Sequence, residues 1–331
     1  VNLGGWLVLE KWMTPSLFKG MAADDEYTFC AAATADQLER LDRHRDTFIT
    51  KADFVWLKQQ GVQAVRLPIG YWAFGGAAPY QPTIEYADRA FAWAEEVGLK
   101  VLLDLHGAPG SQNGRDHSGR IGPKDWYADE KNMQETINIL ERLVRRYKAS
   151  PSFLGIELLN EPGWSPLYPT LRRYYQQAAA MVRRECGPAV WIVYSDFFTP
   201  LLWRLQTQRR PDHNLVIDTH HYQAFGRRDK RLSLAGHIRK IVHKVPRKFR
   251  RVQVRRPLIV GEWSLVLPGT ALEGLNELQQ EAVRRMYGAA QIAAYERTRA
   301  WFYWSYKTED GGVWSFRDCI EKGWLPKLTK G

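Results

Sequence analysis

The chain has 331 residues, of which 45% are hydrophobic and 25% are charged, and its formal net charge is +11. These values are typical of a globular protein with one large core, and they exclude a disordered or collagen-like chain. No stretch has the roughly 20 consecutive apolar residues of a transmembrane helix. Three widely spaced cysteines exclude a disulfide framework.

Short, largely apolar runs alternate along the chain with amphipathic stretches. Because the runs do not alternate polar and apolar residues, they predict parallel strands covered on both faces. The eight runs are Val1–Leu3, Ala64–Leu67, Val101–Leu105, Gly155–Leu159, Val190–Tyr194, Leu215–Asp218, Leu258–Val260 and Trp301–Trp304. The helix-like stretches are Ile84–Val97, Glu130–Tyr147, Leu171–Glu185, Leu234–Val242 and Asn276–Tyr295.

This alternation predicts an α/β fold, a single (β/α)8 TIM barrel over residues 1–331, with its active site at the carboxyl ends of the strands. Residues Met13 to Thr50 do not fit the repeat and are expected to form an extended excursion between the first strand and the first barrel helix. Val1 already lies in the first predicted strand. We therefore expect the natural N-terminus to be missing, and no signal peptide is visible.

Two glutamates follow predicted strands. Glu161 comes just after the run that ends at Leu159, and Glu262 follows Leu258–Val260 and Gly261. Glycosidic bond hydrolysis uses such a pair, with one acid that protonates the leaving oxygen and one carboxylate that attacks the sugar. A single acid at a strand end is usually a solvated charge. The interpretation therefore depends on the residues around both.

Six short motifs surround these acids, in the order Arg66-Leu67-Pro68, Asp104-Leu105-His106-Gly107, Asn160-Glu161-Pro162, His220-His221-Tyr222, Gly261-Glu262-Trp263 and Trp304. Together they resemble the retaining β-glycosidases of glycoside hydrolase family 5. Longer blocks resemble its exo-β-1,3-glucanase branch, namely 1–6, 13–18, 68–74, 105–114 and 304–309. The resemblance runs to about Pro326 and implies a secreted or periplasmic enzyme that releases glucose from the non-reducing ends of β-1,3-glucan.

The resemblance also implies a role for each matching residue. Glu161 would be the general acid and then the base, with a pKa raised by burial or by a neighbouring carboxylate. Glu262 would be the nucleophile, kept ionised by Arg66. Five residues would assist: His106 and Asn160 as donors to the hydroxyl beside the anomeric carbon, His220 and Tyr222 as hydrogen-bond partners around the nucleophile, and Trp304 as a platform under the sugar.

Further matching residues bear on substrate choice. Glu10 and Asp116 match acids that grip the terminal glucose in the exo-glucanase branch, which implies a closed pocket. Phe225 matches one half of an aromatic pair at the pocket mouth. This chain has Arg115 in place of the other aromatic residue, and it has His117 in place of an amide. His117 stays a candidate substrate-binding residue, and the two departures leave glycan preference open.

The sequence predicts neither a metal nor a cofactor. His220 and His221 are adjacent, so on a strand their side chains point to opposite faces, and no third ligand has suitable spacing. No glycine-rich phosphate-binding pattern follows a strand. The fourteen tryptophans are expected to include several that line a saccharide cleft.

The net charge comes from one segment. Residues Arg227 to Arg256 include thirteen Lys and Arg but one acid, Asp229. Interleaved apolar residues fit the charged outer face of an amphipathic barrel helix. The alternative is adhesion to an anionic polymer or surface. Specific nucleic-acid binding is not expected, because the aromatic residues lie with the acids at the strand ends.

Three hypotheses about function remain open. The leading one is a retaining exo-β-1,3-glucanase. A β-glucosidase acting on short mixed or aryl β-glucosides is favoured by Arg115, by His117 and by an interval from Glu262 to Trp304 that is shorter than in fungal relatives. The third, from a different class, is a catalytically silent carbohydrate-binding barrel, because a fold never guarantees activity.

Overall fold

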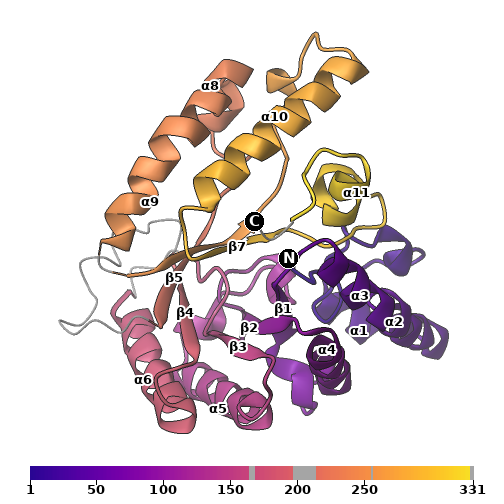
Figure 1. Cartoon of the computed structure of the whole chain (residues 1–331). Helices are drawn as coiled ribbons and strands as arrows, with labels where there is room; N and C mark the ends of the chain where they lie inside the picture. The colour runs from indigo at the N-terminus through magenta and orange to yellow at the C-terminus, as the bar shows by residue number, and fades with distance from the viewer. Residues whose placement is uncertain (164–167, 197–213, 255, 329–331) are drawn as a thin grey trace.

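The structure is a computed structural model that describes all residues except 164–167, 197–213, 255 and 329–331. Within these described residues, seven parallel strands form one sheet in chain order, with helices packed outside it (Figure 1). The strands are β1 (Ala64–Gly70), β2 (Lys100–Gly107), β3 (Phe153–Glu157), β4 (Trp191–Ser195), β5 (Leu215–His220), β6 (Leu258–Trp263) and β7 (Ala300–Tyr303). The α-helices are α1 (Glu26–Ala32), α2 (Ala35–Thr47), α3 (Lys51–Gln59), α4 (Ile84–Val97), α5 (Glu130–Tyr147), α6 (Tyr168–Cys186), α8 (Leu234–Arg239), α9 (Val245–Gln253), α10 (Glu277–Tyr295) and α11 (Phe316–Glu321).

The first predicted strand, residues 1–3, is a single bridge rather than a strand. Asn2 forms a parallel bridge with Arg66. Its backbone N–H donates to the carbonyl of Tyr303 at 2.9 Å, and the N–H of Leu3 donates to the carbonyl of Arg66 at 2.9 Å. Residues 1–3 therefore connect β7 to β1. The predicted barrel fold is confirmed as a nearly closed barrel of seven strands.

Side chains that face the barrel interior change from apolar to polar along the strands. On β2 the residues with period two are Leu102, Asp104 and His106, and all three are buried. Leu102 packs with residues of β4, β5, β6 and β7 in an apolar cluster, Val193, Val216, Ile259 and Phe302. The polar residues follow toward the carboxyl ends of the strands, where a barrel carries its active site.

The predicted excursion before α3 folds around its own apolar cluster. A short 3-10 helix (Pro15–Phe18), α1 and α2 surround a second apolar cluster that includes Leu9 and Phe29. Glu26 and Arg45 form a fully buried ion pair at 2.9 Å. Glu26 Oε2 also accepts from the backbone N–H of Leu9 at 2.8 Å. The excursion thus fixes the chain immediately before Glu10.

Most of the basic segment forms the predicted amphipathic helix. α8 continues through a π-helical turn, Lys240–Lys244, into α9, and the two helices follow one line beside α10 in Figure 1. The side chains of Ile241, Phe249 and Val252 are buried, whereas Arg247, Arg250 and Arg251 are exposed. Lys248 is partly covered, and burial lowers its pKa. Arg255 lies outside the described residues.

None of the helices among the described residues is long and apolar enough to cross a bilayer.

Candidate active site

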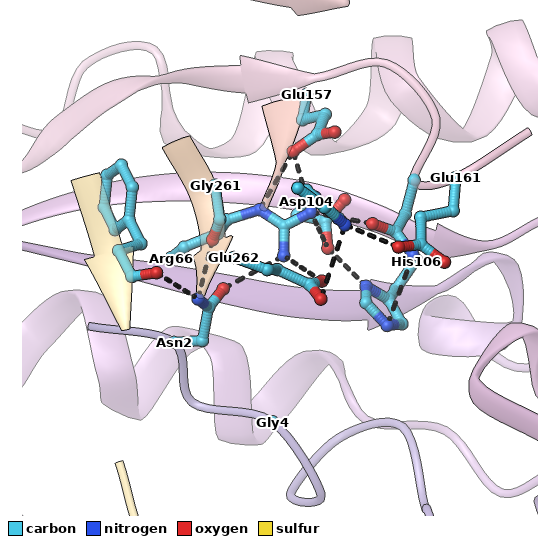
Figure 2. A network of polar contacts seen from close by, with 12 residues as sticks. Asn2, Gly4, Arg66, Asp104, His106, Glu157, Glu161, Gly261 and Glu262 are labelled. Atoms are coloured by element: carbon cyan, nitrogen blue, oxygen red, sulfur yellow. Dashed lines mark hydrogen bonds and ion pairs between the residues drawn. The ribbon is translucent and has the colours of Figure 1, made fainter. Parts of the chain in front are cut away.

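Arg66 on β1 is the centre of a buried polar network (Figure 2). Its Nη2 lies 2.8 Å from Glu157 Oε2 and 3.1 Å from Asp104 Oδ2. Its Nη1 donates to Asn2 Oδ1 at 3.0 Å and lies 3.3 Å from Glu262 Oε1. Burial acts to lower the pKa of Arg66, but the surrounding carboxylates raise it well above its ordinary value. Arg66 is therefore a fixed positive charge beside Glu262.

Glu262 lies near the end of β6, and two side chains contact its Oε2. The Tyr222 hydroxyl donates to this oxygen at 3.0 Å, and His220 Nδ1 lies 3.3 Å away. The preceding Gly261 is required by close packing, because a Cβ there would lie 1.8 Å from Asp218 Oδ2. Its N–H donates to Asp218 Oδ1 at 2.6 Å. The Gly-Glu sequence thus lets a buried acid approach the backbone beside Glu262.

Glu161 follows β3 in a left-handed backbone conformation with φ of 37°, which a residue with a side chain adopts only under constraint. Asn113 Nδ2 donates to its carbonyl at 3.0 Å. Oε1 lies 2.6 Å from His220 Nδ1, and Oε2 lies 3.4 Å from His117 Nε2. One oxygen of Glu161, one of Glu262 and a ring nitrogen of His220 all lie within 4.8 Å of one another. The fold brings the two predicted acids together.

The pKa values of the two acids are in the opposite order to the prediction. Burial acts to raise the pKa of Glu161, but the hydrogen bond and charge of His220, together with His117, lower it to about 2. Burial raises the pKa of Glu262 to about 7, with Glu161 adding to the shift against His220 and Arg66.

His220 explains this order. Burial acts to lower its pKa, but the charges of Glu262 and Asp218 and the hydrogen bond with Glu161 raise it well above the ordinary value. Glu161 and His220 share one proton across their hydrogen bond. In the free protein this proton therefore lies on His220, and Glu161 is ionised.

His106 is a neutral acceptor rather than the predicted donor. Its Nδ1 lies 2.5 Å from Asp104 Oδ2, and a carboxylate only accepts, so Nδ1 carries the proton. Burial lowers the pKa of His106 to about 4, which leaves Nε2 as an acceptor. Asn160 accepts from Arg66 through Oδ1 at 2.8 Å, and its Nδ2 lies 3.4 Å from His106 Nε2, so one amide hydrogen can donate to His106 and the second can donate elsewhere. The His106 ring stacks on Trp304, with centroids 5.4 Å apart.

Glu10 and Asp116 lie around the same centre. Glu10 is only 4% exposed, and Trp12 Nε1 donates to its Oε2 at 2.8 Å. Burial raises the pKa of Glu10 well above its ordinary value, and the charges of Asp116, Glu262 and Glu161 add to the shift. Asp116 begins a short 3-10 helix that also carries His117. Glu10 and Asp116 thus add two acids to the site beside Glu161 and Glu262.

An aromatic group that the sequence did not reveal lies at the outer edge. Phe225 is 63% exposed, and its ring is 5.5 Å from that of Tyr222. Trp314, from the segment after β7, stacks on Phe225 with centroids 6.3 Å apart and meets the edge of Trp12 at 5.2 Å. Phe225 therefore has an aromatic partner, Trp314. This partner comes from a different segment of the chain than Arg115, the position where the sequence comparison expected an aromatic residue. Arg115 is exposed.

Comparison with known proteins identifies the family. The sequence model for cellulase, glycosyl hydrolase family 5, matches residues 31–310. The chain is 36% identical over 366 residues to a probable glucan 1,3-beta-glucosidase A of Aspergillus niger, covering 98% of this chain and 86% of that protein. The chain belongs to glycosyl hydrolase family 5. It is therefore a retaining glycoside hydrolase, and the silent-barrel hypothesis is not supported.

Other relatives of this family 5 enzyme agree. A glucan 1,3-beta-glucosidase of Blumeria graminis is 34% identical, with 99% of this chain and 86% of that protein covered. The fold is similar to that of a rutinosidase from Aspergillus niger, with a TM-score of 0.83 at 22% identity, over 98% of this chain and 96% of that one. It also resembles an endoglucanase from Pseudomonas stutzeri, with a TM-score of 0.58 at 16% identity, over 85% and 87% of the two chains.

Two groups in the described part of this family 5 enzyme have the spacing of metal ligands: Glu157, Asp218 and His220, and Glu161, His220 and Glu262. The residues of each group come from segments far apart in the chain, so sequence spacing did not reveal a third ligand. The argument that no third ligand is available was therefore wrong. The donor sets still do not suit a resident cation. The first group surrounds the positive charge of Arg66, and both need the ring of His220, whose raised pKa keeps it protonated.

Sequence reasoning assigned no role to the acids beneath the site. Glu157 and Asp218 are fully buried inside apolar strands and lie 2.8 Å and 4.0 Å from Arg66. The sequence did contain a signal for these two residues, namely an acid inside an otherwise apolar strand, because a buried carboxylate needs a partner.

Proposed function

We propose that this family 5 enzyme is an exo-acting glucan 1,3-β-glucosidase that releases glucose from the non-reducing ends of β-1,3-glucan. The names of the relatives support this substrate. The observation that carries the mechanism is the separation of at most 4.8 Å between an oxygen of Glu161 and an oxygen of Glu262. Retaining enzymes have carboxyl groups about 5–5.5 Å apart, whereas inverting enzymes need about 6.5–9.5 Å to admit a water.

In this proposal Glu262 attacks the anomeric carbon while Glu161 protonates the leaving oxygen. Glu161 then takes a proton from the water that hydrolyses the glycosyl-enzyme. His220 Nδ1 lies 2.6 Å from Glu161, so the proton that Glu161 needs can pass along this hydrogen bond. Tyr222 and Arg66 stabilise the ionised form of Glu262 from two sides.

The same residues support chain-end action. Glu10 and Asp116 would bind hydroxyls of the terminal glucose, and Trp304 would support its ring. Neutral His106 would accept a hydroxyl hydrogen through Nε2, and the amide of Asn160 would donate. Acids that bind the hydroxyls of the terminal glucose would leave no room for a longer chain on that side. His117 is proposed to contact the leaving oxygen side, because it lies beside Glu161.

A β-glucosidase acting on short mixed or aryl β-glucosides is the second candidate. Phe225 is 63% exposed and stacks on Trp314, and Arg115 is exposed, so the leaving-group side would offer an open aromatic surface rather than a clamp between Phe225 and an aromatic residue at position 115.

Digestion of laminarin followed over time by chromatography tests the proposal. Glucose as the sole early product supports exo action, whereas a ladder of oligosaccharides contradicts it. Proton NMR of the first glucose formed should show the β-anomer, and an initial α-anomer would contradict the assigned pair. A β-glucosidase would hydrolyse cellobiose and aryl glucosides as fast as laminaribiose.

We also propose that residues 1–331 act as one catalytic domain, that the enzyme works outside the cytoplasm as the resemblance suggests, and that the exposed cations of α9 hold it on anionic polymers. Replacement of Arg247, Arg250 and Arg251 by Gln should weaken salt-sensitive retention on an anionic polysaccharide. Retention that does not change with salt would instead assign these residues to an ordinary solvated helix face.

A further inference from the structure

Four exposed cations follow the aromatic residue at the edge of the site and have no part in the proposed hydrolysis. Arg227, Arg228, Lys230 and Arg231 are all exposed and begin two residues after Phe225. The single acid among them, Asp229, is already paired with Lys240. In the part of the chain that the structure describes, neither Arg227 nor Arg228 forms an ion pair with a carboxylate. Their positive charge is therefore available to a ligand.

Their position is fixed by the segment that leads from the site. The Tyr222 hydroxyl contacts Glu262 at 3.0 Å, and the Phe225 ring is 5.5 Å from the Tyr222 ring. Consecutive Cα atoms are about 3.8 Å apart, so the Cα of Arg228 lies no more than about 11 Å from that of Phe225. An arginine side chain can cover most of this distance. A group stacked on Phe225 is within reach of Arg227 and Arg228.

The segment beside the other acid also carries an exposed arginine. Arg115 precedes Asp116 and His117, and His117 Nε2 lies 3.4 Å from Glu161. Within the described residues Arg115 forms no ion pair. The segment that carries His117 beside Glu161 and the segment that carries Tyr222 beside Glu262 thus each bear guanidinium groups that have no ion pair among the described residues.

The residues proposed to hold the terminal glucose are acids. Burial raises the pKa of Glu10, and the charges of Asp116, Glu262 and Glu161 add to the shift, which shows that the four carboxyl groups lie close together. An anionic group on the terminal glucose would be repelled there. An anionic group on the leaving portion would instead meet Arg115, Arg227 and Arg228.

We propose that the leaving-group side of this site prefers β-glucosides whose leaving portion carries an anionic substituent, such as a carboxylate, sulfate or phosphate. The preference rests on the proposed function, because it requires hydrolysis at Glu161 and Glu262. Phe225 and Trp314 supply a stacking surface for the leaving portion, and the arginines select its charge. Arginine suits this role because its planar guanidinium binds carboxylate and phosphate groups through two parallel hydrogen bonds.

The test compares kcat/KM for 4-carboxyphenyl β-D-glucoside with that for its methyl ester. The ratio of the two values is measured for the parent, for Arg227→Gln/Arg228→Gln and for Arg115→Gln. Intrinsic leaving-group reactivity is the same in every variant, so a change in the ratio reports recognition of the charge. Lys100→Gln/Arg297→Gln is the matched control, because it removes the same charge from exposed side chains at the start of β2 and just before the start of β7, at the amino-terminal ends of these strands.

We expect the ratio to fall about threefold for each arginine at low salt, and hence about tenfold for Arg227→Gln/Arg228→Gln. The control should keep the parent ratio. Raising the salt to about 0.5 M should lower the parent ratio toward that of the double variant, because exposed charges are screened.

The outcomes separate this inference from the proposed function. If the neutral ester is not hydrolysed by the parent, the proposed function fails. If the ester is hydrolysed but the ratio is unchanged in both Arg115→Gln and Arg227→Gln/Arg228→Gln, the anionic preference is refuted. An equal fall in the control would also refute it, since net charge rather than position would then set the ratio. Circular dichroism of each variant checks that it is folded.

Discussion

We predict that kcat/KM for a neutral aryl β-glucoside rises with pH through about 7. Above this pH the free enzyme has a protonated His220 and two ionised acids, Glu161 and Glu262. Transfer of that one proton to Glu161, over 2.6 Å, gives the form that hydrolysis needs. Below this pH Glu262 takes up a proton, because burial raises its pKa to about 7. A protonated Glu262 cannot attack.

The magnitude follows from one titrating group. A pKa raised from 4.5 to about 7 corresponds to about 3 kcal/mol of preference for the neutral form. At pH 5 about 1% of Glu262 would be ionised, so kcat/KM should be about 100-fold below its plateau. Initial rates with 4-nitrophenyl β-D-glucoside well below KM measure this directly.

Tyr222→Phe provides the control for the assignment. It removes the hydroxyl that donates to Glu262 Oε2 at 3.0 Å, so the midpoint of the rise should move to higher pH by about 1–2 units. A parent plateau that extends unchanged down to pH 5 would refute the reasoning, because the enzyme would then be active with both His220 and Glu262 protonated. A midpoint that does not move in Tyr222→Phe would assign the rise to another group.

Three other predictions concern single residues. Glu262→Gln should abolish hydrolysis of every substrate, whereas Glu161→Gln should retain the first step with activated aryl glucosides that need no protonation. Loss of that first step in Glu161→Gln, or activity in Glu262→Gln, would contradict the assigned roles. Glu10→Ala and Asp116→Ala should each lower kcat/KM by about 100-fold, and values within threefold of the parent would show that the pocket is open. Gly261→Ala should destabilise the fold by about 3 kcal/mol in urea unfolding, because its Cβ would meet Asp218, while Gly269→Ala, with open space around it, should cost under about 1 kcal/mol.

The sequence predicted features that depend on neighbours along the chain. α4 and α5 begin and end at the predicted residues, since their amphipathic periodicity is local. Seven of the eight apolar runs are strands, and Glu161 and Glu262 meet because the carboxyl ends of parallel strands share one edge of the barrel. The roles of these two residues stay a prediction.

Features that depend on distant partners were missed. The stacking of Trp314 on Phe225 brings together residues that are far apart in the chain, and no local sequence pattern predicts it. The reversed pKa order of Glu161 and Glu262 has the same origin, because His220 lies 59 positions from Glu161 and contacts it at 2.6 Å. The closure of the barrel by residues 1–3 likewise depends on hydrogen bonds to β1 and β7 rather than on the length of the run.

Two strands carry a similar inward pattern of an apolar residue, an aspartate and a histidine, and the structure shows why the two histidines differ in pKa. β2 presents Leu102, Asp104 and His106 at alternate positions, and β5 presents Val216, Asp218 and His220, so each histidine follows an aspartate on the same face. His106 has a pKa of about 4, while the pKa of His220 is well above its ordinary value.

The difference comes from what else each pair meets. Burial is the largest cause that lowers the pKa of His106, and the positive charge of Arg66, which lies 3.1 Å from Asp104, acts in the same direction. His220 instead lies 2.6 Å from Glu161 and 3.3 Å from Glu262, and their negative charges retain its proton. In the proposed mechanism, one Asp-His pattern thus provides a neutral hydroxyl acceptor on β2 and a proton donor for Glu161 on β5. The side chains that set this division, Arg66 and the two glutamates, lie on other segments of the barrel.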